Sequence, residues 1–459
     1  MQIETDPANC FADPSDTAIP LHPVAEGGLD EVDGLEPVAL AWAKANGFTG
    51  KAGETCMIAD AEGGIAAVLV GTGKDDTPLP MAFRLAGLGR KLPEGTYALP
   101  QDLNQAALAF AMGSYTFTRY RKGATSVPKL AVPEDDATRR RVEGVYIARD
   151  LVNIPANDMG PDALETAFRK LAQTHDADVT VTKGDDLLEK NFPMVHAVGR
   201  ASAQAPRVLD MTWGRDGDPL VTLVGKGVTF DTGGLNIKTA SSMALMKKDM
   251  GGAANVMGLA HMVMDAKLPV RLRLIVGAVE NAISGNAFRP GDVLQTRKGM
   301  TVEIGNTDAE GRLVLGDCLT LGDEDEPQIM IDMATLTGAA RVALGPDLPP
   351  FYTHDDDFAA ELEREAQECF DPLWRMPLWK PYHSMLSSAV ADVNHISAGG
   401  FAGSITAALF LEKFVEKTAT WAHFDIFGWV PSDKPWARKG GEAQGIRALL
   451  DVLEARYAR

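Results

Sequence analysis

Hydrophobic positions in the first third of the chain follow two different periods. A continuous apolar run at residues 66–71 predicts a buried strand, and apolar residues spaced three and four apart near 103–120 predict a helix. A charged helical pattern at 134–151 comes next, and a segment rich in proline and asparagine ends it. We therefore expect a small N-terminal α/β domain at 1–126, followed by a linker and connecting helix at 127–158.

The remaining residues, 159–459, alternate short apolar runs with helical patterns, which is typical of strands covered by helices on both faces. Strands are predicted at 220–225, 272–279 and 329–334, helices at 253–267 and 313–321, and a hairpin around 297–299. We expect one larger domain with a mixed central sheet. In sheets of this kind, sites form in the loops beyond the carboxyl ends of the strands.

Composition and charge indicate a globular protein that does not bind nucleic acid. The chain has 459 residues, of which 45% are hydrophobic and 23% charged, and this suffices for two domains with apolar cores. Its formal net charge of -19 repels phosphate backbones and anionic membrane surfaces. Nucleic-acid binding and membrane attachment are therefore not expected.

Cysteine and targeting patterns favour the cytoplasm. The four cysteines are scattered and form no CxxC pair, which indicates neither a disulfide framework nor a thiolate zinc site. The first twenty residues lack the basic start and apolar run of a signal peptide. No later stretch reaches the roughly 20 apolar residues that a bilayer crossing needs. We expect a cytoplasmic protein.

Charged side chains gather in three of the predicted loops. They are Lys226, Asp231, Lys238, Asp249, Asp308, Glu310 and Arg312. In the last loop, alternate positions of an extended segment would aim two carboxylates and a guanidinium to the same side. Taken alone, the Asp-Ala-Glu run at 308–310 is also typical of a helix N-terminus, where acidic residues are favoured.

These loops resemble those of the leucyl (cytosol) aminopeptidase family, which are two-metal exopeptidases. The family's signature loop matches Asn-Thr-Asp-Ala-Glu-Gly-Arg-Leu at 306–313. The similarity continues through the segments at 224–231, 289–292, 332–338 and 421–425, and so spans most of residues 150–459. The first domain is less diagnostic, and the resemblance implies a macro-like fold for it.

The resemblance implies two divalent metal ions per subunit. One ion would be bound by Asp231, Asp308 and Glu310, and the other by Lys226, Asp231, Asp249 and Glu310. Four clustered carboxylates would repel one another without metal, and their summed charge balances two dications. Lys226 can coordinate only as a neutral amine, so its pKa should be strongly depressed. An oxygen-rich set leaves the metal open, with Mn²⁺ or Zn²⁺ among the reasonable occupants.

The same resemblance implies a reaction and an assembly. A hydroxide bridging the two ions would attack the first carbonyl of a peptide with a free N-terminus. Lys238 would stabilise the oxyanion, and Arg312 would hold a bicarbonate ion that shuttles the proton to the leaving amine. Because family members form hexamers, we expect a homohexamer.

The pocket for the first side chain is also implied by resemblance. Met246, Thr335 and Gly338 fall at positions that line it in the family. Phe427 stands where many relatives have alanine, and, if it points inward, it narrows the pocket and moves preference away from leucine. His423 lies in a predicted strand and is expected to be a hydrogen-bonded core residue rather than a catalytic one.

Two other functions stay open at this point. Clustered carboxylates alone do not name the bond that is broken, so a two-metal phosphoesterase or another amidase is an alternative. A non-enzymatic protein whose first domain binds nucleotide or DNA is a second alternative, although the acidic balance opposes DNA.

Overall fold

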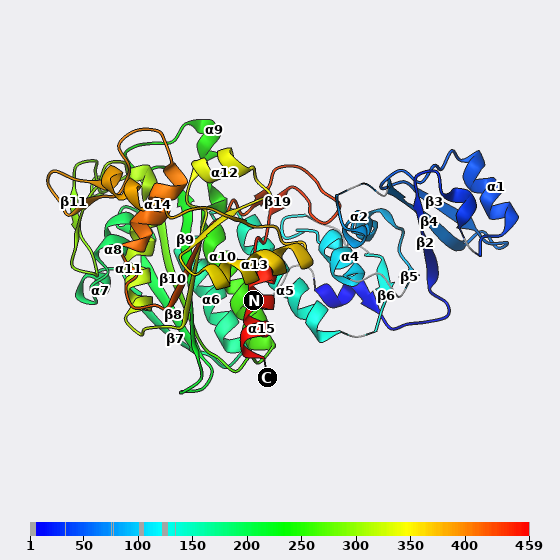
Figure 1. The fold of residues 1–459 in the computed structure, drawn as a ribbon, viewed down its shortest axis with the longest axis horizontal. Coiled ribbons are helices and arrows are strands. Elements are labelled where there is room, and N and C mark those ends of the chain that lie inside the picture. The colour runs from blue at the N-terminus through cyan, green and yellow to red at the C-terminus, as the bar shows by residue number, and fades with distance from the viewer. Residues whose placement is uncertain are drawn as a thin grey trace. The chain divides into compact units, whose positions relative to one another are not determined.

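The computed structural model of the chain divides into two compact units (Figure 1). It describes residues 6–32, 34–74, 76, 78–100, 105–121, 127–133 and 135–458. The smaller unit contains the chain up to Tyr146 together with Ser432–Lys439, and the larger unit contains Ile147–Pro431 and the chain from Gly440 onward. The division falls inside helix α5 (Asp136–Asn153). The domain limits expected from the sequence stay a prediction.

The smaller unit is built on a six-stranded sheet in the order β1-β6-β5-β2-β4-β3, in which only β3 runs antiparallel to its neighbour. Its strands are β1 (Phe11–Ala12), β2 (Ile19–Ala25), β3 (Thr55–Ala59), β4 (Ile65–Gly73), β5 (Thr96–Ala98) and β6 (Lys129–Ala131). Its helices are η1 (Pro7–Cys10), η2 (Leu29–Glu31), α1 (Pro37–Ala45), α2 (Met81–Leu85), α3 (Leu88–Lys91) and α4 (Ala106–Ser114).

Two sequence predictions fall in this unit. The apolar run at 66–71 is confirmed as part of β4, where Val68 and Val70 enter one apolar cluster and Leu69 another. The helix expected near 103–120 is α4, which ends at Ser114 because Tyr115 leaves the helical region with φ -51° and ψ 130°. Residues 103 and 104 of that prediction lie outside the described residues.

The larger unit contains an eight-stranded mixed sheet in the order β15-β14-β17-β13-β9-β10-β8-β7. Its strands are β7 (Asp178–Lys183), β8 (Arg207–Trp213), β9 (Leu220–Asp231), β10 (Arg271–Asn281), β13 (Ile329–Ala334), β14 (Pro350–Thr353), β15 (Trp374–Arg375) and β17 (Thr420–Asp425). Two small sheets accompany it, formed by β11 (Val293–Gln295), β12 (Thr301–Glu303) and β16 (Val393–Asn394), and by β18 (Trp429–Val430) and β19 (Gly440–Gly441).

Helices cover both faces of this sheet (Figure 1). One face carries α6 (Pro161–Thr174), α10 (Gly251–Asp265), α13 (Asp356–Glu368) and α15 (Ile446–Tyr457), and the other carries α7 (Asp186–Glu189), α8 (Pro193–Gly199), α11 (Gly311–Asp323) and α14 (Gly403–Glu412). Shorter helical segments are α9 (Ala240–Met243), α12 (Gly338–Leu344), η3 (Met246–Met250), η4 (Thr307–Ala309) and η5 (Lys380–Leu386). The predicted fold class is confirmed.

The segment at 306–312 differs from the prediction of an extended loop. Thr307–Ala309 form the 3-10 helix η4, and α11 begins at Gly311. The Asn306 side chain accepts a hydrogen bond from Asp308 N at 2.9 Å and so caps the turn. Alternating positions therefore do not bring these charged side chains together; a helical turn does.

The four inner strands β17, β13, β9 and β10 run parallel to one another, so their carboxyl ends meet at one edge of the sheet. Asp425, Asp231 and Asn281 are the last residues of three of them, and Thr335 follows the fourth. The predicted position of the polar residues, beyond the carboxyl ends of the strands, is confirmed.

Among the described residues, none of the helices combines the length and the apolar character of a membrane-spanning helix.

Candidate active site

A cavity of about 470 Å³ lies at the carboxyl edge of the large sheet. It is lined by all seven of the charged residues singled out in the sequence: Lys226, Asp231, Lys238, Asp249, Asp308, Glu310 and Arg312. The four residues expected to form the first-side-chain pocket, Met246, Thr335, Gly338 and Phe427, line the same cavity. Segments far apart in the chain thus contribute to one site.

Lys226 lies inside strand β9 and is almost fully buried, with 3% of its surface exposed. Its Nζ donates to Asp249 Oδ1 at 2.8 Å and lies 3.1 Å from Glu310 Oε1. Burial alone lowers the pKa of Lys226, but the charges of Asp249, Glu310 and Asp231 outweigh it and raise the pKa above its usual range. The expected depression of this pKa depends on dications beside the amine and stays a prediction for the metal-bound protein.

Asp231, Asp308 and Glu310 form the core of the candidate metal centre. One carboxylate oxygen from each lies within 4.8 Å of the others. Burial, with the neighbouring carboxylates, raises the pKa of Asp231 to about 6 and that of Glu310 to about 7. Glu310 Oε2 is buried and has no hydrogen-bond partner within the described chain. A cation at this point would satisfy that oxygen and relieve the repulsion between carboxylates.

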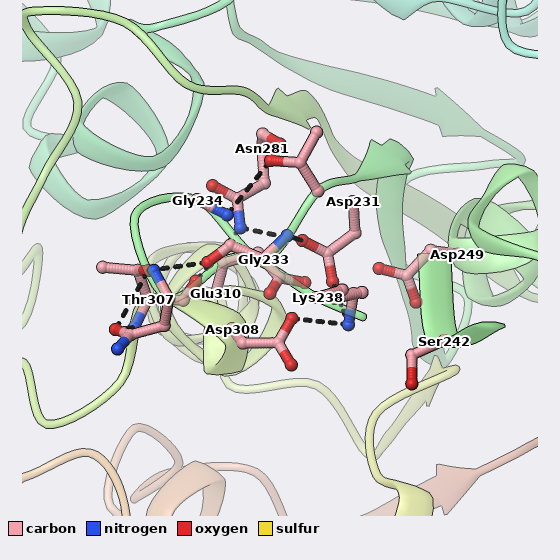
Figure 2. Close-up of polar contacts among 12 residues, drawn as sticks. Asp231, Gly233, Gly234, Lys238, Ser242, Asp249, Asn281, Thr307, Asp308 and Glu310 are labelled. Carbon is pink, nitrogen blue, oxygen red and sulfur yellow. Dashed lines mark hydrogen bonds and ion pairs between the residues drawn. The ribbon is translucent and has the colours of Figure 1, made fainter. Parts of the chain in front are cut away.

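Asp231 is held in place by neighbouring donors (Figure 2). Its Oδ1 accepts from Gly233 N and from Asn281 Nδ2, each at 2.8 Å. Gly233 and the next glycine have φ values of 87° and 63°, which a residue with a Cβ rarely adopts, so the chain can turn directly after β9. Oδ2, the other oxygen, remains directed toward Lys238.

Lys238 lies between two of the carboxylates. Its Nζ is 2.8 Å from Asp231 Oδ2 and 2.5 Å from Asp308 Oδ1 (Figure 2). Burial lowers its pKa, but both carboxylates raise it to a value above the usual range for lysine. The ammonium group is therefore a proton donor at the rim of the carboxylate cluster.

Thr307 joins the loop after β9 to the turn that carries Asp308. Its Oγ1 donates to Gly233 O at 2.6 Å and accepts from Asn236 N at 2.8 Å. Sequence reasoning assigned no role to Thr307 or to Asn281, which contacts both Asp231 and Thr307 O. For Asn281, the available signal was its position two residues after the end of a predicted apolar strand.

Arg312 is a buried cation in the first turn of α11, with 8% of its surface exposed. Its Nη1 donates to His395 O at 2.7 Å, whereas Nε has no hydrogen-bond partner within the described chain. Burial lowers its pKa to about 10, so the guanidinium stays charged at neutral pH. An uncompensated guanidinium that lines a cavity is suited to bind a planar anion.

The expected pocket residues differ in what they contact. Thr335 Oγ1 donates to Asp249 Oδ1 at 2.8 Å and thus also positions a candidate metal ligand. The Phe427 ring lies near two cations, with its centroid 4.9 Å from Lys248 Nζ and 5.2 Å from Arg341 Cζ. Neither cation was singled out in the sequence, because each is an isolated basic residue until the fold brings both to Phe427.

His423 is confirmed as a hydrogen-bonded core residue. Its side chain is fully buried, and Nδ1 lies 2.6 Å from Asp332 Oδ1. Trp421 Nε1 donates to the other oxygen of the same carboxylate at 2.8 Å. Asp332 thereby connects two side chains of β17 that lie two residues apart, and none of the three residues lines the cavity.

The chain matches two family models. The cytosol aminopeptidase family catalytic domain matches residues 146–450, and the M17 aminopeptidase N-terminal domain matches residues 19–133. A curated relative, the probable cytosol aminopeptidase of Roseiflexus castenholzii, is 39% identical over 393 residues, covering 81% of this chain and 79% of that protein.

Solved structures of similar proteins share the fold over nearly the whole chain. Cytosol aminopeptidase from Coxiella burnetii is 45% identical, with a TM-score of 0.92, and the match covers 98% of this chain and 100% of that one. The bottromycin maturation enzyme BotP in complex with Mn is 30% identical, with a TM-score of 0.85, covering 96% and 100%. A mutant tomato leucine aminopeptidase is 28% identical, with a TM-score of 0.82, covering 96% and 95%.

Proposed function

Since the chain belongs to the cytosol aminopeptidase family and is therefore a metal-dependent peptidase, we propose that its cavity releases the first residue of peptides at a two-metal centre. The observation that carries this proposal is the approach of Asp231, Asp308 and Glu310 to within 4.8 Å. Lys226 and Asp249 lie directly beside them. A free N-terminal amine on the substrate is part of the proposal.

Two overlapping sets of residues would hold the ions. Asp231, Asp308 and Glu310 would hold one, and Lys226, Asp249 and again Asp231 and Glu310 would hold the other. When bound, the two ions supply positive charge that lowers the pKa of water and polarises the substrate carbonyl. Mn²⁺ and Zn²⁺ are the proposed occupants, and the similar enzyme BotP has been solved with Mn. Lys226 would give up its proton on binding, which releases Asp249 from their ion pair.

Two cations would act on the substrate without ligating metal. Lys238, which lies beside Asp231 and Asp308, would stay protonated and would donate to the carbonyl oxygen as negative charge develops there. Arg312 would hold a bicarbonate ion through its unpartnered Nε and the neighbouring guanidinium nitrogen, so that a base stands near the attacked carbonyl. Met246, Thr335, Gly338 and Phe427 would contact the first side chain.

Location and assembly complete the proposal. The curated relatives are named cytosol aminopeptidases, which supports action in the cytosol. A homohexamer is proposed from the family resemblance, and size-exclusion chromatography with light scattering would test it.

A comparison of substrates tests the proposed activity. After metal loading, the protein should hydrolyse leucyl and alanyl amides but not their N-acetylated forms, because the free amine is needed. It should not hydrolyse phosphate esters. Turnover of blocked amides would indicate another amidase, and turnover of phosphate esters alone would indicate a phosphoesterase.

A further inference from the structure

Lys248 is a buried cation that lacks an anionic partner. It is 6% exposed, lies on η3 beside Asp249 and lines the cavity. Its Nζ faces the Phe427 ring at 4.9 Å, and no carboxylate in the described part of the chain forms an ion pair with it. A cation–π contact stabilises a cation but leaves its charge uncompensated. Burying such a charge is costly unless an anion pairs with it.

Arg341 places a second cation at the same ring. It lies on α12, lines the cavity, and its Cζ is 5.2 Å from the Phe427 centroid. Its guanidinium likewise has no ion-pair partner in the ranges that the structure describes. Phe427 itself is held by its backbone N–H, which donates to Gln444 Oε1 at 3.0 Å.

The carboxylates near this pair of cations are already engaged. Asp249 Oδ1 accepts from Lys226 Nζ and from Thr335 Oγ1, each at 2.8 Å. Asp425 accepts from the backbone of the β13–α12 turn, including Thr337 N at 2.9 Å, and from a buried serine hydroxyl. Arg341 is exposed to solvent, whereas Lys248 is buried, so the anion that complements the buried charge would come from a bound molecule that also reaches Arg341.

We infer that Lys248 and Arg341, arranged around Phe427, form a carboxylate-binding end of the first-residue pocket, so that the enzyme favours peptides that begin with glutamate or aspartate. The inference rests on the proposed aminopeptidase function. Phe427 follows β17 and lines the same cavity as Thr335, a proposed pocket residue. A guanidinium and an ammonium together can bind both oxygens of a carboxylate.

Glutamyl and glutaminyl p-nitroanilides test the inference, because glutamine is the neutral counterpart of glutamate and neither substrate has a C-terminal carboxylate. The metal-loaded enzyme should show a kcat/KM ratio of glutamyl to glutaminyl substrate of about 10 or more, since a hydrogen bond to a charged group is worth about 1.5–3 kcal/mol. A ratio of one or less, with turnover of neutral residues intact, would overturn the inference and leave the proposed function standing. Absence of turnover with every aminoacyl substrate would overturn both.

Substitutions assign the preference to the two cations. Lys248→Met, which keeps the length of the side chain, and Arg341→Gln should each lower the ratio toward one, mainly through KM. The matched control Arg364→Gln, whose side chain is exposed on α13, should leave it unchanged. If Lys248→Met fails to fold, Arg341→Gln still tests the inference. Calorimetric titration of the wild type with L-glutamate and L-glutamine provides a second test, and equal affinity for the two amino acids would reject the inference.

A carboxylate could also come from the C-terminus of a short peptide. Comparison of alanyl-alanine with its C-terminal amide distinguishes this source from the side chain of the first residue. Equal effects of Lys248→Met and Arg341→Gln on the dipeptide and its amide support the side-chain assignment. A loss confined to the dipeptide, with an unchanged glutamyl to glutaminyl ratio, would assign the cations to the peptide C-terminus and overturn it.

Discussion

The aliphatic part of Lys226 crosses the start of α11 at Gly311, where an added Cβ would lie 2.4 Å from Lys226 Cε and 2.8 Å from its Nζ. Gly311 is therefore required by space rather than by backbone conformation. Its neighbour Glu310 begins the helix without a side-chain capping bond, so its carboxylate is free to face the amine. The helix-capping interpretation of the acidic run at 308–310 thus does not account for Glu310.

We predict that Gly311→Ala displaces Lys226 from the carboxylate cluster. Overpacking of this kind should lower the free energy of unfolding by about 1–3 kcal/mol. Metal content after dialysis should also fall, because one proposed ligand moves. Urea unfolding and elemental analysis measure both, with Gly285→Ala as the control, since an added Cβ there meets nothing within 4 Å. Equal behaviour of the two variants would contradict the prediction.

Metal binding should stabilise the folded chain. Adding Mn²⁺ or Zn²⁺ to chelated protein should raise the unfolding temperature, because a ligand bound to the native state at 100 times its Kd adds about 2.7 kcal/mol. Glu310→Gln should lose most of this shift, since Glu310 belongs to both proposed ion sites. Glu189→Gln, on the exposed surface, should retain it. The absence of a shift in the wild type would count against the metal centre.

Substitution of Lys238 and substitution of the carboxylates should have different effects on metal content and turnover. Lys238→Ala should keep its metal, because removing an ammonium from Asp231 and Asp308 leaves these carboxylates free for cations. Its kcat should fall about 10²–10³-fold, as for the loss of an oxyanion donor. Asp308→Ala and Glu310→Ala should lose both metal and turnover. Equal metal loss in all three variants would remove the separate role of Lys238.

Phe427 should restrict the size of neutral first residues. Phe427→Ala should raise the ratio of leucyl to alanyl amide hydrolysis by about tenfold, since one or two methylenes in a hydrophobic pocket are worth about 1–3 kcal/mol each. Steady-state rates on the two amides give this ratio. An unchanged ratio would show that the ring does not limit the pocket.

His395 should make the protein less stable in acid. Burial, together with the charge of Arg312, lowers its pKa to about 3 from an ordinary 6.5. Gly305 N donates to Nδ1 at 3.1 Å, so Nε2 carries the proton that Asn306 O accepts at 2.8 Å. Between pH 6.5 and 3 the unfolded chain binds one more proton here, so stability falls as pH falls.

Urea unfolding of chelated protein at several pH values between 7.5 and 5 measures this contribution, which approaches about 1.4 kcal/mol per pH unit below pH 6.5. His395→Gln keeps an amide donor for Asn306 O and should flatten the slope. The same slope in wild type and variant would assign the acid sensitivity to other groups.

Local periodicity predicted the sheet and its active edge well, because mainly apolar runs mark the inner strands β9, β10 and β13. The run at 329–334 matches β13, and that at 220–225 lies in β9, which extends through polar positions to Asp231. The turn at Thr307–Ala309 was not predicted, since it depends on one capping side chain. Short polar segments carry no period that separates a helical turn from an extended loop.

Contacts between side chains far apart in the chain could not be predicted from the sequence pattern. Asn281 orients Asp231 across 50 positions, and Lys248 and Arg341 converge on Phe427 from two separate elements, η3 and α12. The seven charged residues could be proposed as site residues because the family resemblance implies that they lie together. Without it, each was an isolated charge with an ordinary surface explanation.

The smaller unit also contains the distant segment Ser432–Lys439, so one break in the chain cannot separate it from the larger unit. The pair β18 and β19 brackets this segment, whose Lys434 O accepts from Arg90 and whose Trp436 packs edge-to-face on Phe83 at 6.0 Å. A truncated chain beginning at Ile147 would leave the indole and that carbonyl without these partners. A chimaera that takes the smaller unit from a relative must therefore also take that relative's segment equivalent to Ser432–Lys439. The two stretches, although distant in the chain, have to be exchanged together.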